Sequence, residues 1–120
     1  MIPINREDVP VRIENEGIEF RTREVGDMTV GWVRLAKGTN LAPALQGLTD
    51  DLCPCPHWGY VVSGRVRMQE KNGESVYEAG QAFYWAPGHA PEALEDCEYI
   101  DFSPTQGLEE VIAHITGGGA

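Results

Sequence analysis

Hydrophobic and polar residues alternate along much of the chain, in short runs that end at glycine or proline. Residues 17–35 hold two such runs, separated by the turn residues 25–27 (Val-Gly-Asp). Residues 60–77 hold two more, and the Asn72-Gly73 pair between them is a strong signal for a β-hairpin. The pattern therefore predicts antiparallel strands in both segments.

The second half of the chain continues this pattern. Residues 82–85 (Ala-Phe-Tyr-Trp) form an apolar run that breaks at Pro87-Gly88, and residues 98–103 read as a last strand. Short strands about ten residues apart with Gly and Pro turns are typical of a sandwich or barrel, not of a βαβ sheet. Residues 41–48 are apolar but interrupted by proline and glycine, which favours a loop or a single helical turn.

One helix is expected at the end of the chain. The apolar residues there follow the spacing i, i+3, i+4, i+7, which is that of a short amphipathic helix lying on the β body. These residues are Leu108, Val111, Ile112 and Ile115.

The length of 120 residues fits one domain with one core. We divide the chain into an N-terminal arm (residues 1–16), a barrel with its terminal helix (residues 17–116) and a flexible tail (residues 117–120). The fold class predicted is all-β.

The net charge of the chain argues against two classes of binding partner. Nine Lys and Arg stand against nineteen Asp and Glu, a formal net charge of −10. An acidic chain repels phosphate backbones and anionic lipids, so we expect neither nucleic acid nor membrane as a partner. Three cysteines cannot all pair within one chain, and no secretory signal or long apolar run is evident. These features predict a cytoplasmic protein with free thiols.

Side chains that can bind a metal ion are concentrated between residues 51 and 60. Asp51, Cys53, Cys55 and His57 recur at every second position, and in an extended chain every second side chain points to the same face. Pro54 and Pro56 favour such an extended segment. Carboxylate, thiolate and imidazole are all zinc ligands, and we expect two or three of the four to bind, with a further ligand from elsewhere.

His89 is the leading candidate for that further ligand, because it follows the Pro87-Gly88 turn. His114 lies on the polar side of the terminal helix and is assigned no role. Cys97 is interpreted as an ordinary strand thiol.

Two other interpretations of these residues stay open. Free cysteines often pack as small hydrophobes, and single histidines are commonly hydrogen-bonded core or surface groups. A nucleophilic cysteine paired with His57 or His89 is the weaker alternative, because acidic surroundings disfavour a thiolate.

Two segments resemble the two motifs of small cupins. They run from His57 to Val66 (HWGYVVSGRV) and from Gly80 to His89 (GQAFYWAPGH). The resemblance implies a double-stranded β-helix, a jelly-roll-like barrel, with Asp51, Cys53, Cys55, His57 and His89 around its mouth.

The metal ligands of the family do not map onto this chain one for one. Aligned on Gly64, His57 takes the slot of the family's glutamate, and Cys53 and Asp51 take those of its paired histidines. Counted from the spacing of the pair, Cys55 and His57 take the histidine slots instead. The family's last histidine falls on Pro91, two residues after His89.

The resemblance implies a metal-binding cupin with a small-molecule ligand. The thiolate and imidazole ligands favour zinc as the divalent ion. The ion would keep one coordination position open for water or substrate, which would allow hydrolysis, isomerisation or decarboxylation. A ligand-binding barrel without catalysis, or a metal- or redox-sensing module, is the alternative. Such barrels commonly dimerise through edge strands, and the apolar strand around Ile18 and Phe20 suits a homodimer.

Aromatic and thioether side chains provide candidate walls for the ligand pocket. For Trp85 and Phe102 we favour a simpler interpretation, in which both fill the core. The set is Trp32, Tyr60, Met68, Tyr84, Trp85, Tyr99 and Phe102.

Overall fold

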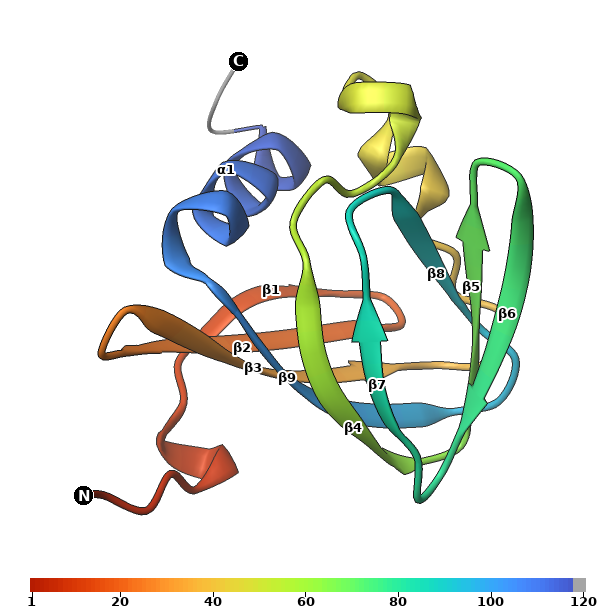
Figure 1. Ribbon diagram of the computed structural model, residues 1–120. Coiled ribbons are helices and arrows are strands. Elements are labelled where there is room, and N and C mark those ends of the chain that lie inside the picture. The colour runs from red at the N-terminus through yellow and green to blue at the C-terminus, as the bar shows by residue number, and fades with distance from the viewer. Residues whose placement is uncertain (118–120) are drawn as a thin grey trace.

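Two antiparallel sheets face each other in the computed structural model, which describes residues 1–117 (Figure 1). The larger sheet has the strand order β1-β2-β3-β9-β4-β7 and the smaller one the order β6-β5-β8. The strands are β1 (Val11–Asn15), β2 (Ile18–Val25), β3 (Met28–Leu35), β4 (His57–Ser63), β5 (Arg65–Glu70), β6 (Gly73–Glu78), β7 (Ala82–Trp85), β8 (His89–Ala93) and β9 (Cys97–Pro104). This is the all-β jelly-roll fold that the sequence predicted.

The predicted hairpins are present, and one of their turns is displaced by one residue. β2 and β3 pair from Val25↔Met28 to Ile18↔Leu35, across the turn at residues 26–27. β5 and β6 form the second hairpin, but their pairing up to Glu70↔Gly73 makes Lys71 and Asn72 the turn residues and places Gly73 in β6. The segment expected as a loop or helical turn contains the 3-10 turn η2 (Ala42–Leu45).

Two strands lie where the sequence indicated none. Val11–Asn15, within the segment interpreted as an arm, form β1 and pair with β2. His89–Ala93 form β8 although Pro91 lies at its centre. In the described part of the chain, β5 is the one strand that pairs with β8, and only isolated bridges from Asn40 and Cys53 lie along its other side. β8 is therefore an edge strand, where a residue without an N–H is tolerated.

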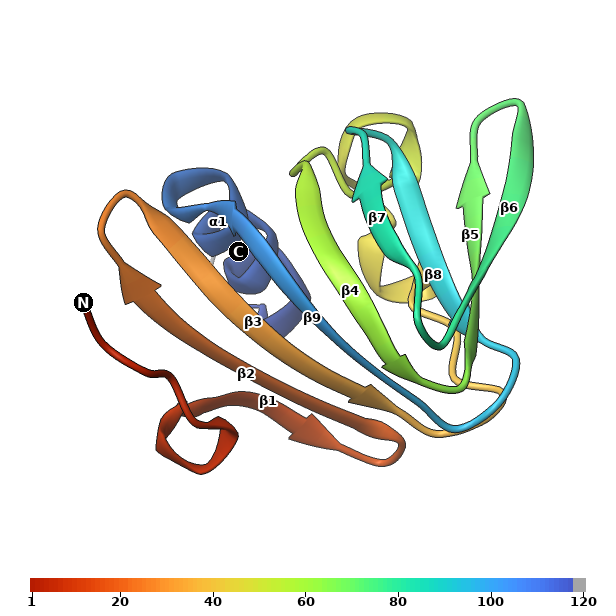
Figure 2. The same cartoon turned by 60° about the horizontal axis from the view of Figure 1, so that its bottom comes forward.

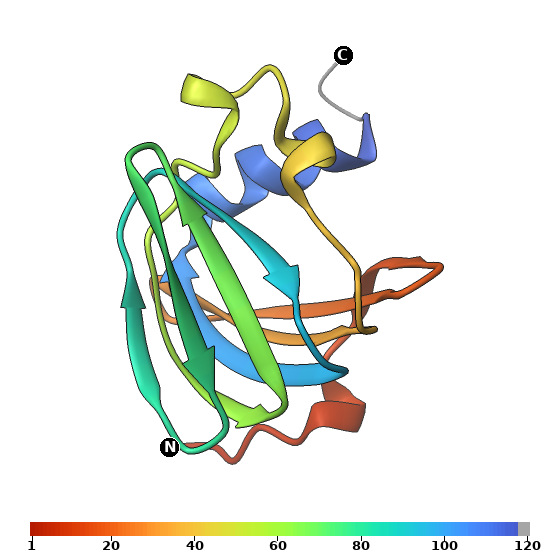
Figure 3. The same cartoon turned by 90° about the vertical axis from the view of Figure 1, so that its right-hand side faces the viewer.

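The helix α1 (Thr105–Thr116) covers one end of the barrel, as Figure 3 shows. It ends at Gly117 in the left-handed conformation, where glycine carries no Cβ penalty. Its buried residues Leu108, Val111 and Ile112 pack with Leu45 of η2 and with Cys53. Each buried aliphatic side chain contributes about 1.5–3 kcal/mol, so α1 is firmly seated. Residues 118–120 of the predicted tail lie outside the described part of the chain.

Two of the three expectations about apolar residues need correction. Trp85 is in the core as predicted, but Phe102 is not: it is 46% exposed on the outer face of β9. Ile18 and Phe20 are not at a free edge, because β1 pairs with β2 beyond them and both side chains pack against the core.

No helix among the described residues is long and apolar enough to cross a membrane.

Candidate metal centre

A backbone bridge holds Cys53 beside His89. The N–H of Cys53 donates to the carbonyl oxygen of His89 at 2.8 Å. The N–H of Gly88 donates to the carbonyl oxygen of Cys53 at 2.7 Å. Gly88 has a φ of 96°, a left-handed conformation that suits glycine and lets the chain turn sharply into β8. The sequence motif Pro87-Gly88 thus delivers His89 to the cysteine segment.

His57 enters the same place from β4. It is the first residue of that strand, paired with Trp85 at the end of β7, and its side chain points into the barrel. The centroids of the His57 and His89 rings are 4.9 Å apart. Cys53, His57 and His89 are all buried, with exposed fractions of 3–6%.

The three side chains fit a metal ion by distance. One ligand atom from each residue lies within 4.8 Å of the other two. Sγ of Cys53 and Nε2 of His57 are 3.7 Å apart. Tetrahedral zinc, with bonds of about 2.3 Å to sulfur and about 2.0 Å to nitrogen, requires a separation of ~3.5 Å between these atoms. The spacing of these two atoms is therefore close to the one that a tetrahedral metal ion requires.

Hydrogen bonds orient both imidazoles. Nδ1 of His57 lies 2.5 Å from Oγ of Ser103, and Nδ1 of His89 lies 2.7 Å from the carbonyl oxygen of Ala86. A carbonyl oxygen can only accept, so Nδ1 of His89 carries the proton and its Nε2 is free. Metal-binding histidines are usually held in this way through their other nitrogen.

A buried carboxylate stands behind His57. Oδ2 of Asp101 is 3.7 Å from Nδ1 of His57, and its Oδ1 has no hydrogen-bond partner. Gly31 and Gly59 flank Asp101 on the neighbouring strands, and a Cβ at Gly31 would collide with Oδ1. Burial raises the pKa of Asp101 to about 7. Asp101 is an inward-facing residue of β9 and is buried inside the barrel.

Burial sets the charge of the three candidate ligands. It lowers the pKa of His57 and of His89 to about 4, so both imidazoles are neutral at neutral pH. It raises the pKa of the Cys53 thiol to about 11. Neutral imidazoles are ready to bind a metal, and a bound cation would itself favour the thiolate.

Asp51 and Cys55 lie away from this cluster. Asp51 is exposed, has a φ of 58°, and accepts a hydrogen bond from the N–H of Gly47 at 2.9 Å. Cys55 is buried near α1, where a Cβ on Gly107 would come within 3.4 Å of its Sγ. The chain is thus not uniformly extended from Asp51 onward, and only Cys53 and His57 of the alternating four meet His89.

The cluster borders a small cavity of about 60 Å³ under α1. A second cavity of about 60 Å³, lined almost wholly by apolar side chains, lies next to it. Both are lined by Phe20, Leu41, Tyr99, Leu108, Val111 and Ile115. Of the pocket walls expected from the sequence, Trp85 and Tyr99 line the cavity, whereas Tyr60, Tyr84 and Phe102 are exposed.

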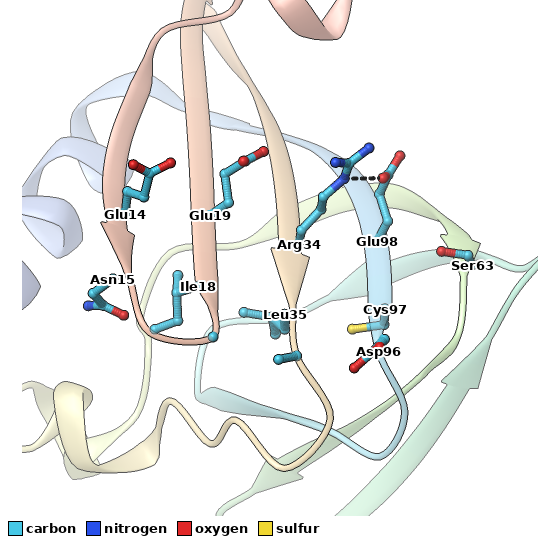
Figure 4. A pocket seen from close by; sticks show the side chains of 12 residues that line it. Glu14, Asn15, Ile18, Glu19, Arg34, Leu35, Ser63, Asp96, Cys97 and Glu98 are labelled. Atoms are coloured by element: carbon cyan, nitrogen blue, oxygen red, sulfur yellow. Dashed lines mark hydrogen bonds and ion pairs between the residues drawn. The ribbon is translucent and has the colours of Figure 1, made fainter.

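A larger hollow lies elsewhere, along the β1–β2 turn and the ends of β3 and β9 (Figure 4). It is open, with a volume of about 520 Å³, and the ion pair between Arg34 and Glu98, 2.6 Å apart, crosses its wall. The candidate metal ligands do not line it.

The residues that orient the imidazoles were missed from the sequence. Ser103 and Asp101 are inward-facing members of β9, alternating with outward residues, and this alternation was their only signal. Ser103 is 46 positions from His57, so only the fold brings them together.

Solved structures with a similar fold include several cupins. An RmlC-like cupin from Shewanella frigidimarina is 17% identical, with 84% of this chain and 88% of that chain covered and a TM-score of 0.62. KdgF from a Halomonas species is 24% identical, with 83% and 90% covered and a TM-score of 0.57. A mutant of Bacillus subtilis oxalate decarboxylase is 19% identical, with a TM-score of 0.63; the match covers 82% of this chain but only 28% of that enzyme.

These identities show a shared fold. No protein-family model matches the sequence, and a comparison with curated proteins finds no match. The chain therefore has the small-cupin fold, with a buried Cys-His-His cluster at the covered end of its barrel.

Proposed function

We propose that this protein is a zinc-binding cupin, with Cys53, His57 and His89 as the metal ligands. The observation that carries the proposal is the convergence of one sulfur and two imidazoles within 4.8 Å of one another. The hydrogen bond that Nδ1 of His89 donates to the Ala86 carbonyl oxygen supports it, because this bond leaves the Nε2 lone pair of His89 for a metal. The contact of His57 Nδ1 with Ser103 likewise occupies Nδ1, and Nε2 is the ring nitrogen that lies 3.7 Å from Cys53 Sγ.

The ligand set favours zinc over other ions. Thiolate and imidazole suit Zn²⁺ and disfavour Mg²⁺ and Ca²⁺, which prefer oxygen. Three protein ligands leave a fourth tetrahedral position, as in catalytic rather than structural zinc sites. The three ligands line the adjacent cavity, so the fourth position would face that cavity and be open to water or to an oxygen of a small ligand.

Such a centre can support chemistry on a small molecule. Bound zinc supplies Lewis acidity and lowers the pKa of a coordinated water. Ser103 and the Ala86 carbonyl keep the imidazoles in place, and the aromatic and aliphatic lining excludes bulk water. Hydrolysis, isomerisation and decarboxylation are the reactions we propose, the last being that of oxalate decarboxylase, which shares the fold.

The ligand must be small, or α1 must move. A cavity of about 60 Å³ has room for a few water molecules only. The adjoining apolar cavity of similar size would take a short hydrocarbon part. We therefore propose a ligand with a small polar head at the metal and a short apolar tail beneath α1.

The closed surroundings favour a second candidate, a non-catalytic metal or redox-sensing barrel. With the three ligands only 3–6% exposed, a bound ion could pin β4 and β8 without meeting a substrate. Cobalt-substituted protein separates the two. A change of its visible spectrum on adding azide or cyanide indicates an open position, and an unchanged spectrum favours the second candidate.

We also propose a cytoplasmic homodimer. The three cysteines are free and buried, which suits a reducing compartment.

Elemental analysis of protein purified without chelators tests the zinc site. We expect about one zinc per chain in the wild type. Cys53→Ser, His57→Ala and His89→Ala should each lose most of it, because two ligands hold zinc far less tightly than three.

Matched variants of the nearby residues serve as controls. Cys55→Ser, Asp51→Asn and His114→Ala should each retain zinc, since none of these side chains reaches the cluster. A zinc-free wild-type protein whose melting temperature does not rise with added zinc would refute the site. Zinc loss in Cys55→Ser but not in Cys53→Ser would mean that Cys55, and not Cys53, supplies the thiolate.

A further inference from the structure

The outer face of β7, β4 and β9 is unusually apolar. These strands lie side by side at one end of the larger sheet (Figure 2). Four aromatic side chains on this face are about half exposed, with exposed fractions of 46–52%. They are Trp58, Tyr60, Tyr84 and Phe102, and we call them, together with Val62, the aromatic face.

The strand register puts the rings in contiguous rows. Trp58 pairs with Tyr84 on one side and with Phe102 on the other. The ring centroids of Trp58 and Tyr84 are 5.1 Å apart. Tyr60 stands in the next row, between Ala82 and Ile100. The side chains thus form one continuous platform rather than scattered apolar positions.

The area of the aromatic face reaches the size that a dimer needs. An aromatic side chain carries ~150–250 Å², so four half-exposed ones and a valine present roughly 400–500 Å². This area is comparable to the largest apolar patch of a typical monomer, and such patches often serve as binding surfaces. Two copies meeting here would bury roughly 1,000 Å² with the surrounding rim, the lower limit of a specific interface.

Charge also favours a second copy of this chain. The outward residues of β4 and β7 are uncharged, and Glu98, at the border on β9, is paired with Arg34 at 2.6 Å. With a net charge of −10, two identical chains repel over most of their surface. They can approach at lowest electrostatic cost through an uncharged face.

Another part of the same sheet is already covered. The segment before β1 lies over the outer face of β2, where Nη1 of Arg21 donates to the carbonyl oxygens of Arg6 and Val9 at 3.4 and 3.1 Å. Val9 is only 1% exposed as a result. The chain therefore covers the outer surface at β2 itself and leaves the aromatic face bare.

We infer that two copies of this chain associate through their aromatic faces, in an isologous, sheet-to-sheet dimer. The inference rests on the proposed homodimer and specifies its surface. A two-fold axis through the face would place the Trp58 row of one copy against the same row of the other, as a self-complementary patch requires.

This surface lies directly behind the candidate metal centre. Outward Trp58 follows inward His57 in β4, and outward Phe102 lies between inward Asp101 and Ser103 in β9. The dimer would therefore brace the strands that carry His57 and its hydrogen-bond partner.

Light scattering coupled to size-exclusion chromatography tests the surface. We expect wild-type protein at about twice the chain mass of 13.2 kDa. Trp58→Lys and Tyr84→Lys should each weaken dimerisation at least 30-fold, as loss of a central aromatic contact typically does, and should elute as monomers. Two separate variants guard against misfolding of one, and circular dichroism confirms the fold of each.

Lysines at other exposed valines are the matched controls. Val76→Lys on β6 and Val11→Lys on the edge strand β1 should both stay dimeric. A monomeric wild-type protein would overturn both the homodimer and this surface. A dimer that survives both aromatic variants, or that dissociates in Val11→Lys, would overturn the surface alone. Neither result depends on zinc, so the test is independent of the metal proposal.

Discussion

At the scale of single residues, Asp101 and the two histidines respond to acid in opposite ways. Burial raises the pKa of Asp101 to about 7, so the folded protein takes up this proton more readily than the unfolded chain. Burial lowers the pKa of His57 and His89 to about 4, so the unfolded chain takes up those protons more readily. As the pH falls from 7 to 4, Asp101 adds stability and the histidines remove it.

Asp101→Asn should separate these contributions in the metal-free protein. At pH 8 the wild type bears the cost of a buried charge, so we expect the variant to have a free energy of unfolding about 1–4 kcal/mol higher. The difference should shrink as the pH falls and vanish near about pH 3, where Asp101 is protonated in both the folded and the unfolded state. Urea denaturation at several pH values measures it.

Without Asp101, only the histidines remain to set the acid response at this site. The stability of the variant should therefore fall more steeply than that of the wild type between pH 6.5 and 4. A variant that is less stable than the wild type at pH 8 would contradict the unfavourable burial of this carboxylate.

The site residues were only partly visible in the sequence. Cys53, His57 and His89 belong to residue types that bind metals and stand near turns, so they could be nominated. Asp101 and Ser103 could not, because their roles come from the pairing of β9 with β4. The positive φ of Asp51 is a local conformation that the two-residue spacing does not reveal.

At the scale of elements, strands with clear alternation and glycine turns were predictable, whereas two edge strands were not. Pro91 concealed β8, since proline argues against a paired strand unless it lies at an edge. β1 alternates weakly and finds its place only against β2. Whether such a segment becomes a strand depends on the neighbouring strand that it pairs with, and the local hydrophobic pattern does not identify that neighbour.

Close packing between strands makes Gly59 irreplaceable. Its backbone is not in the left-handed region, so space is the constraint: a Cβ there would collide with the Ile100 carbonyl oxygen and approach Cα of Asp101 at 3.0 Å. We expect Gly59→Ala to lower the free energy of unfolding by at least about 3 kcal/mol, or to prevent folding. Thermal denaturation measures this loss.

Gly73 is the matched control within the other sheet. A Cβ at Gly73 meets nothing within 4 Å. Gly73→Ala should therefore change the stability by less than about 0.5 kcal/mol. Equal effects of the two substitutions would mean that β4 and β9 are not as closely packed as described.

At the scale of the whole molecule, the regular spacing of strands and turns predicted a sandwich or barrel, and the resemblance of two segments to the cupin motifs specified the jelly roll. The cover formed by α1 was only half predictable: its amphipathic spacing predicted a helix on the β body, but not that it would close the end holding the cluster. The outward placement of Phe102 was missed, because an apolar residue in a strand can face either side of the sheet. That error concerns the aromatic face, where the exposed side chains suit a partner rather than a core.

X-ray absorption at the zinc edge of the wild-type protein tests whether one thiolate and two imidazoles hold the metal. We expect one sulfur at about 2.3 Å, with imidazole nitrogens at about 2.0–2.1 Å completing the protein ligands. A shell with two sulfurs, which would bring in Cys55, or a shell with none would contradict it.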